Sequence, residues 1–183
     1  PLFFNTVNVT NLSNMFAYTE KFNQPLKFNT INVTNMRYMF SYAKNFNKPL
    51  NFNTINVKDM SYMFADTINF NQPLKFNTEK VENLSYMFSG TANFNQSLEL
   101  LNTINVTNMS CIFSHEIKFN SKLFKNTGNV KNMSHMFFKA LNFNQPIYFN
   151  TVNVTDMMGM FYDAIKFNQS LEMLNTENVI NMC

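Results

Sequence analysis

A unit of about 24 residues repeats along the whole chain, and it constrains the fold more than any other feature. A clear copy reads FNTINVTNMRYMFSYAKNFNKPLN and runs from Phe28 to Asn51. One valine marks the same position in every copy: Val9, Val33, Val57, Val81, Val106, Val130, Val154 and Val179. Successive marker valines lie 24 or 25 residues apart. A fixed period of this size predicts a solenoid, in which each copy forms one coil stacked on the last.

The repeat favours a single elongated domain over residues 1–183. Hydrophobic residues make up 45% of the chain and charged residues 14%, which supplies a core and lacks the composition of disordered proteins. The chain begins and ends inside a coil without a polar capping repeat. We therefore expect a segment of a longer array, or ends that are buried in an assembly.

Each coil shows two local patterns. After the marker valine, apolar residues recur at the third, sixth and seventh positions, as Met36, Met39 and Phe40 do in the second coil. This spacing indicates one face of a short helical turn. The segment from Phe46 to Phe52 indicates a short extended stretch, although its proline argues against a long regular strand. Together these patterns predict an α/β repeat solenoid, right-handed, of about seven coils.

Several residue types recur in register as columns. Two phenylalanine columns predict continuous aromatic spines through the core. They are Phe16, Phe40, Phe64, Phe88, Phe113, Phe137 and Phe161, and Phe22, Phe46, Phe70, Phe94, Phe119, Phe143 and Phe167. A threonine column that includes Thr30 and Thr54 predicts buried hydroxyls bonded to the next coil's backbone. Asparagine, with 34 copies, predicts amide ladders along the axis and tight turns. The extra residue of each 25-residue step predicts a bulge.

The sequence offers no arrangement of residues typical of catalysis, so we expect no enzyme, cofactor or metal site. His115 and His135 are the only histidines, and they occupy different columns. Cys111 and Cys183 lie three coils apart, too far for a disulfide, and we expect free thiols. The net charge of +3 comes from scattered lysines and gives no reason to expect nucleic acid. No apolar run is long enough for a transmembrane helix.

One candidate partner-binding face stands out. Tyr38, Tyr62 and Tyr86 occupy the same column in successive coils, with Arg37 beside the first and Tyr42 nearby. Exposed tyrosines are good anchors for protein or glycan partners. The alternative is that these rings pack flat against neighbouring coils and serve the fold alone.

The fifth coil departs from the rule of the others. Ile112, Glu116 and Lys125 stand where other coils carry methionine, alanine or threonine, and phenylalanine. Local repacking would explain these changes, and so would a contact patch for a partner.

The motifs N-V-T-N-M-S-x-M-F and F-N-Q-P-L resemble a repeat found in mycoplasma and other bacterial surface proteins, which is grouped with BspA-like leucine-rich-repeat proteins. Asn105–Ser110 followed by Phe113, and Asn144–Ile147, carry the pattern well. The resemblance implies a leucine-rich-repeat-like solenoid and supplies no catalytic residues.

We therefore expect a surface-displayed interaction or adhesion module, extracellular or on the cell surface, that binds a protein or glycan. The alternative is a structural component of a virion or cell envelope that packs against neighbouring subunits.

Overall fold

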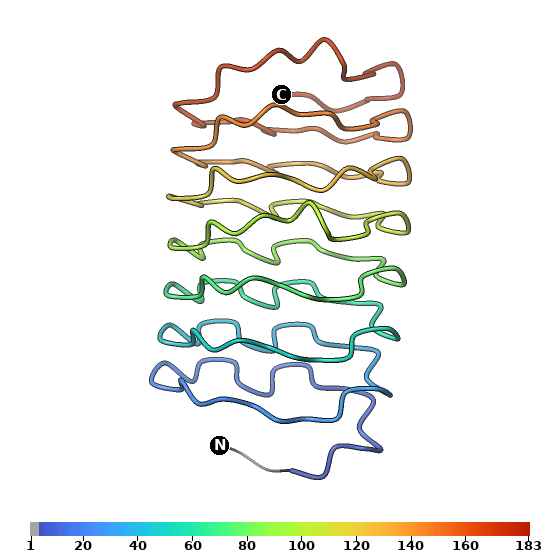
Figure 1. Cartoon of the computed structure of the whole chain (residues 1–183). Helices are drawn as coiled ribbons and strands as arrows, with labels where there is room; N and C mark the ends of the chain where they lie inside the picture. The colour runs from blue at the N-terminus through green and yellow to red at the C-terminus, as the bar shows by residue number, and fades with distance from the viewer. Residues whose placement is uncertain (1–3) are drawn as a thin grey trace.

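The computed structural model describes residues 4–183, which form a stack of similar coils (Figure 1). Each repeat copy makes one turn of this solenoid, as the sequence period predicts. Residues 4–183 contain no helix and no named strand. Regular pairing is limited to one parallel bridge between neighbouring coils, always at the second residue after the marker valine. The bridges join Asn11, Asn35, Asp59, Asn83, Asn108, Asn132, Asp156 and Asn181 in succession.

The predicted α/β class, with its short helical turn, is wrong. The helix fails because the fifth and ninth residues after the marker valine adopt left-handed backbone, as Tyr38 and Tyr42 do with φ of 57° and 60°. Such angles end a right-handed helix. The observed segment is a run of tight turns, in which the amide of Ser41 donates to the carbonyl of Tyr38. The predicted extended stretch forms no strand within the described residues.

Backbone hydrogen bonds between coils replace the helical bonds. Alternate amides after the marker valine donate to carbonyls of the next coil: Met36 to Asp59 and Phe40 to Met63, each at 2.9 Å. The residue directly after the marker valine donates back to the previous coil, as Lys58 does to Thr34 at 2.8 Å. Neighbouring coils are therefore held at strand-like spacing without a continuous ladder.

The core follows the predicted columns. The marker valines from Val33 to Val154 are fully buried. Within one coil, the rings of Phe40 and Phe46 stack at 4.2 Å between centroids, and Phe40 stacks on Phe64 of the next coil at 5.7 Å. The two aromatic spines are therefore confirmed and form one double stack. Each buried ring contributes roughly 2–3 kcal/mol to the hydrophobic stabilisation.

The threonine column and one asparagine column behave as predicted. The buried hydroxyl of Thr30 donates to the carbonyl of Asn53 in the next coil at 2.9 Å. The side-chain oxygen of Asn47 accepts from the backbone amide of Asn71 at 3.0 Å, which makes a ladder along the axis. The column that contains Asn29 instead closes turns within its own coil, because its side-chain oxygen accepts from the amide of Ile31.

The extra residue of each long coil forms the predicted bulge. The amide of Leu101 donates to the carbonyl of Leu98, which closes a turn that leaves Leu100 91% exposed. The second long coil repeats this turn between Leu171 and Leu174.

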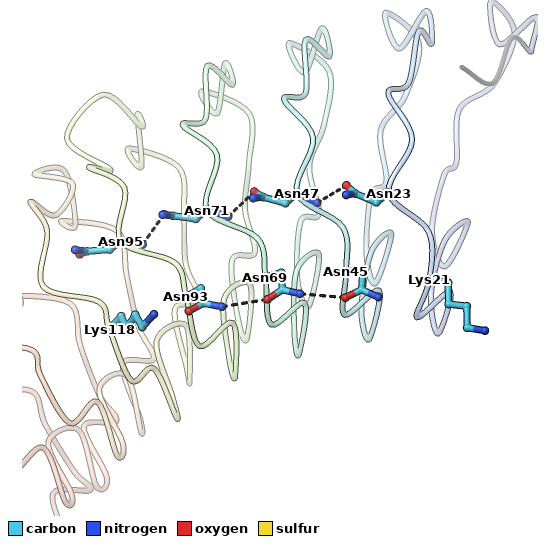
Figure 2. A pocket seen from close by; sticks show the side chains of 9 residues that line it. All are labelled: Lys21, Asn23, Asn45, Asn47, Asn69, Asn71, Asn93, Asn95 and Lys118. Atoms are coloured by element: carbon cyan, nitrogen blue, oxygen red, sulfur yellow. Dashed lines mark hydrogen bonds between the residues drawn. The ribbon is translucent and has the colours of Figure 1, made fainter.

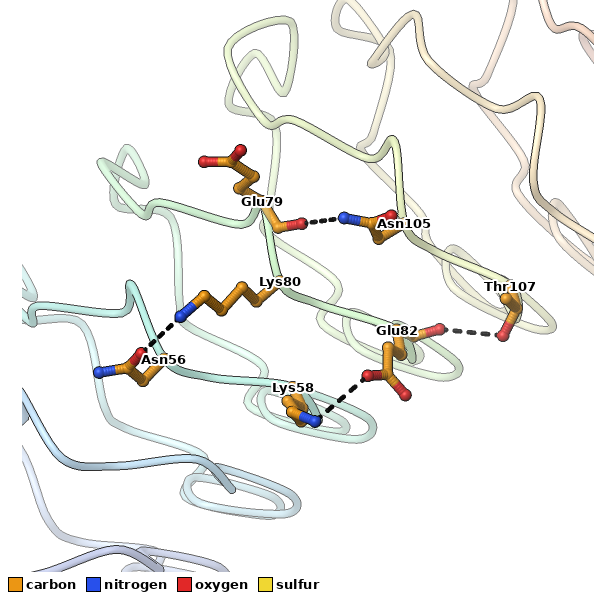
Figure 3. A network of polar contacts seen from close by, with 7 residues as sticks. All are labelled: Asn56, Lys58, Glu79, Lys80, Glu82, Asn105 and Thr107. Carbon is orange, nitrogen blue, oxygen red and sulfur yellow. Dashed lines mark hydrogen bonds and ion pairs between the residues drawn. The ribbon is translucent and has the colours of Figure 1, made fainter.

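A polar network joins coils on the side of the marker valines (Figure 3). The side-chain nitrogen of Asn56 donates to the backbone carbonyl of Ile31 in the previous coil at 2.8 Å. Lys80 replaces asparagine at the equivalent position of the next coil, and its ammonium reaches back to the Asn56 side-chain oxygen at 2.8 Å. Lys58 and Glu82 form an exposed ion pair beside it at 3.7 Å. This column of the repeat therefore tolerates a lysine in place of asparagine, and the coil keeps its path.

The fifth coil repacks its core locally. Ile112 is fully buried in the place of methionine. The expectation that Lys125 takes the place of a core phenylalanine is wrong, because Phe124 fills that place and stacks on Phe149 at 5.7 Å. Lys125 is exposed and pairs with Glu99 at 2.8 Å. The one-residue shift lets the coil keep an aromatic core.

Candidate functional site: a tyrosine groove

The tyrosines of the candidate face form a continuous stack. The rings of Tyr38, Tyr62 and Tyr86 lie 4.4 Å apart between successive centroids, and each ring is partly exposed. The rings pack flat against one another, as one interpretation of the sequence expects, and they still reach solvent, so partner binding stays a prediction. Each ring is thereby held in place by its neighbours before a partner arrives.

A second tyrosine column runs beside this stack. Tyr18 and Tyr42 stack at 4.8 Å and are 72% and 38% exposed. Between the two columns lies a groove of about 570 Å³, which we call the tyrosine groove. It is lined by Tyr18, Tyr38, Ser41, Tyr42, Tyr62, Ala65, Asp66, Tyr86, Ser89, Gly90 and His115. The solenoid therefore gathers tyrosine rings from four successive coils, and His115 from the fifth, around one open groove.

The turns of the coil place both columns. Tyr38, Tyr42 and Tyr62 all have φ between 57° and 60°, a conformation that costs a bulky residue about 1–2 kcal/mol. Their backbone amides are satisfied across the coil interface, since Tyr42 donates to Ala65 at 2.8 Å. The inter-coil bonds and the ring stacking offset the backbone cost in each coil.

Arg37 lies over the stack rather than in the groove wall. Its guanidinium carbon is 4.9 Å from the Tyr38 ring centroid and 5.7 Å from that of Tyr62. One guanidinium nitrogen also donates to the Tyr38 hydroxyl at 3.4 Å. Of the five predicted residues, the four tyrosines line the groove and the arginine adds a cation over the rings.

The sequence reasoning left Asp66, Gly90 and His115 out of the site. All three follow Tyr18 and Tyr42 in the ninth-residue column, so the register of the repeat was the signal that could have found them. The Asp66 carboxylate raises the pKa of Tyr42 through its charge. A side chain at Gly90 would meet the Asp66 carboxylate at 2.4 Å, so glycine at this position leaves room for that carboxylate in the groove.

The environment of Tyr62 and Tyr86 favours the protonated form of their hydroxyls. Burial raises the pKa of Tyr62, and a hydrogen bond with the Cys111 thiol raises that of Tyr86 above its ordinary value. At neutral pH these rings therefore offer hydroxyl donors and acceptors rather than negative charge. The groove suits a partner that carries both apolar groups and hydrogen-bonding groups.

The remaining candidate residues are dispersed. The rings of His115 and His135 each contact Phe138, at 5.2 and 5.3 Å between centroids. Cys111 is buried and Cys183 is exposed, both as free thiols. Residues 4–183 hold no group of three or more histidine, cysteine or acidic side chains placed to bind a metal ion. Over the same residues, no helix is long and apolar enough to span a membrane.

Residues 4–183 form a stack of similar coils, which is the architecture of a repeat protein (Figure 1). A family model described as "Mycoplasma protein of unknown function, DUF285" matches residues 3–99, 48–125, 75–147 and 99–183. The overlapping matches cover almost the whole chain, so the chain belongs to this family, and the predicted mycoplasma-type repeat is confirmed. No curated protein and no solved structure shows significant similarity to the chain.

Proposed function

We propose that this chain is a non-enzymatic interaction module, displayed on a cell surface, that binds a protein partner through the tyrosine groove. One observation carries the proposal: the prearranged stack of Tyr38, Tyr62 and Tyr86 beside the exposed pair of Tyr18 and Tyr42. Tyrosine and arginine are the residues that most often dominate binding energy at protein interfaces. Rings that are already ordered lose little conformational entropy on binding.

The test uses substitutions that the turns should tolerate. Asparagine adopts left-handed backbone readily, so Tyr42→Asn removes a ring without straining the coil. Arg37→Glu reverses the charge over the stack. Tyr148→Asn is the matched control, because Tyr148 is 71% exposed and lies outside the groove.

Beads that carry each variant would be titrated with a panel of purified extracellular proteins and with intact cells. We expect saturable binding that weakens roughly 30-fold or more in Tyr42→Asn and Arg37→Glu, the loss typical of an interface hot spot, and is unchanged in Tyr148→Asn. Equal binding by all four proteins would refute the role of the groove. Protease treatment of intact source cells tests the display, since a displayed chain is cleaved while cytosolic proteins are spared.

A structural part of a virion or cell envelope is the second candidate. It is favoured by the way coils join, since backbone amides such as those of Met36 and Phe40 donate directly to the next coil. Neighbouring subunits could pack on such regular faces. Light scattering against concentration separates the candidates, because a structural part should assemble and a binding module should remain monomeric.

A further inference from the structure

A second groove, larger than the tyrosine groove, follows the solenoid axis and has a different chemistry (Figure 2). It encloses about 840 Å³ and is lined by two parallel rows of asparagines. The inner row is Asn23, Asn47, Asn71 and Asn95, and the outer row is Asn45, Asn69 and Asn93. Lys21 and Lys118 lie at the two ends of the outer row (Figure 2). We call it the asparagine groove; it shares no lining residue with the tyrosine groove.

The inner row is fixed in orientation. The side-chain oxygens of Asn23, Asn47 and Asn71 each accept from the backbone amide of the next asparagine in the row, at 3.0 Å. The same oxygens of Asn47 and Asn71 also accept from the side-chain nitrogens of Gln72 and Gln96, at 2.9 and 3.0 Å. These bonds orient the amide groups, whose side-chain nitrogens donate no hydrogen bond within residues 4–183. The row therefore presents a line of prearranged hydrogen-bond donors, one from each coil.

The outer row is linked side chain to side chain. The nitrogen of Asn69 donates to the oxygen of Asn45 at 3.1 Å, and that of Asn93 donates to Asn69 at 3.2 Å. Each link uses one of the two hydrogens on the donating nitrogen and one lone pair of the accepting oxygen, so donors and acceptors are left over. The outer row can therefore both give and accept hydrogen bonds.

The charge of the groove narrows the ligand class. Between its terminal lysines the lining carries only neutral amides. Recognition of a nucleic acid backbone requires several cations along the ligand, which the groove lacks. An added peptide strand would need free backbone amides, and the inner row's amides at Asn47, Asn71 and Asn95 are already bonded. A neutral ligand rich in hydroxyl groups fits the remaining donors and acceptors.

We propose that the asparagine groove binds a neutral, extended polysaccharide laid along the solenoid axis, with about one sugar per coil. Sugar hydroxyls both donate and accept, which matches amides that do the same. Coils repeat at strand spacing, roughly 5 Å, and an extended β-1,4-linked glycan rises by a similar distance per sugar. Successive sugars of such a chain are flipped relative to one another, so the same hydroxyl faces the groove at every second coil and hydroxyls of the opposite edge face it at the coils between. The amides both donate and accept, so they can bond to either edge. The proposal stands independently of the tyrosine groove.

The test titrates the whole chain, by calorimetry and amide NMR shifts, with β-1,4-linked hexasaccharides of glucose and of N-acetylglucosamine. The matching disaccharides and an anionic polyuronate serve as comparison ligands. We expect a hexasaccharide to bind and to shift the amides of the inner row, and the disaccharides to bind much more weakly. Preferential binding of the polyuronate, or no binding of either hexasaccharide, would overturn the proposal.

The variant that tests the site is Asn69→Lys. Lysine occurs naturally in this column at Lys21, Lys118 and Lys166, so the coil should tolerate it. The longer side chain blocks the groove and removes an amide, and we expect hexasaccharide affinity to fall about tenfold or more. Asn142→Lys is the matched control: it lies in the same column, outside the groove, and adds the same charge. Equal loss in both variants would show that binding takes place elsewhere.

Discussion

The fourth and fifth coils make similar turns after the marker valine, but they differ in polarity and hydrogen bonding at one fully buried position. In the fourth coil, the Thr91 hydroxyl is fully buried and donates to the carbonyl of Phe64 at 2.7 Å. In the fifth coil, the same column holds Glu116, which is also fully buried, and neither carboxyl oxygen has a hydrogen-bond partner. The path is therefore set by the backbone bonds and the aromatic spine, and it persists around a poorly matched side chain.

The aromatic spine lets the fifth coil keep its path around the unpaired Glu116 carboxyl. Removing one ring of the spine should therefore have the largest effect on stability. In the fourth coil, Phe88 stacks on Phe64, Phe94 and Phe113 at 5.9, 4.2 and 6.0 Å, so Phe88→Ala should lower the free energy of unfolding by about 3–5 kcal/mol. Urea denaturation measures the loss. Phe124 packs more loosely, at 5.7 Å from Phe149 and 6.4 Å from Phe113, and Phe124→Ala should cost less. A larger loss for Phe124→Ala would mean that the fifth coil is the better packed of the two.

Exchanging the residue types at positions 91 and 116 tests this difference between the two coils directly. Glu116→Thr removes an unpaired carboxyl and supplies a hydroxyl of the kind used in the fourth coil. We expect it to raise the free energy of unfolding by about 1–3 kcal/mol, the cost of one buried unsatisfied polar group. The reverse change, Thr91→Glu, should destabilise the fourth coil. Paired urea titrations of both variants would show the opposite signs, and destabilisation by Glu116→Thr would mean that the carboxyl has a stabilising role.

The same carboxyl should make stability depend on pH. Burial raises the pKa of Glu116 well above its ordinary value, so the folded chain keeps a proton that the unfolded chain has lost. Stability from this group is then full below the ordinary glutamate pKa and falls as pH rises toward the raised pKa. The slope approaches about 1.4 kcal/mol per pH unit in that window. Thermal unfolding across pH should show this decline in the natural chain and not in Glu116→Thr; identical profiles would show that Glu116 does not titrate on unfolding.

The columns explain how much could be read from the sequence. A residue that recurs at one position in every coil must meet its own copies, so the aromatic spine, the Thr30 bonds and the bulge at Leu100 were predictable. The stack of Tyr38, Tyr62 and Tyr86 followed from the same rule, although its exposure did not. The groove between the two tyrosine columns depends on the conformation of the turns. The order of residues does not reveal that conformation, so the groove could not be predicted.

The predicted helical turn is wrong for a physical reason. Apolar spacing of three, three and one fits a helix, but it also fits the observed run of tight turns, which buries Val33, Met36, Met39 and Phe40. Left-handed residues are usually glycine or asparagine, and here Tyr38 and Tyr42 occupy those positions, so the usual signal was missing. The shift that places Phe124 rather than Lys125 in the core was likewise hidden, because counting residues assumes that every coil keeps one register.

A single side-chain hydrogen bond between regular coils should contribute less to the free energy of unfolding than the changes above. Thr54 is buried, and its hydroxyl donates to the carbonyl of Asn77 at 2.9 Å, so Thr54→Val should cost about 0.5–1.5 kcal/mol. The exposed Thr34 makes a similar bond to Thr10 at 3.2 Å, and Thr34→Val should cost less because water replaces the bond. Urea titration of the two variants ranks them. Equal losses would imply that burial does not govern the strength of the inter-coil bonds.

The smallest effect should come from the surface of the fifth coil. Lys125 and Lys122 both approach the Glu99 carboxylate, at 2.8 and 3.5 Å, and both ammonium groups are largely exposed. Lys125→Ala leaves Lys122 in place, and exposed ion pairs contribute little, so we expect no measurable change in the free energy of unfolding. Urea titrations at low and high salt would check this. A loss as large as that of Thr54→Val, removed by salt, would show that surface charge rather than Phe124 holds the fifth coil in register.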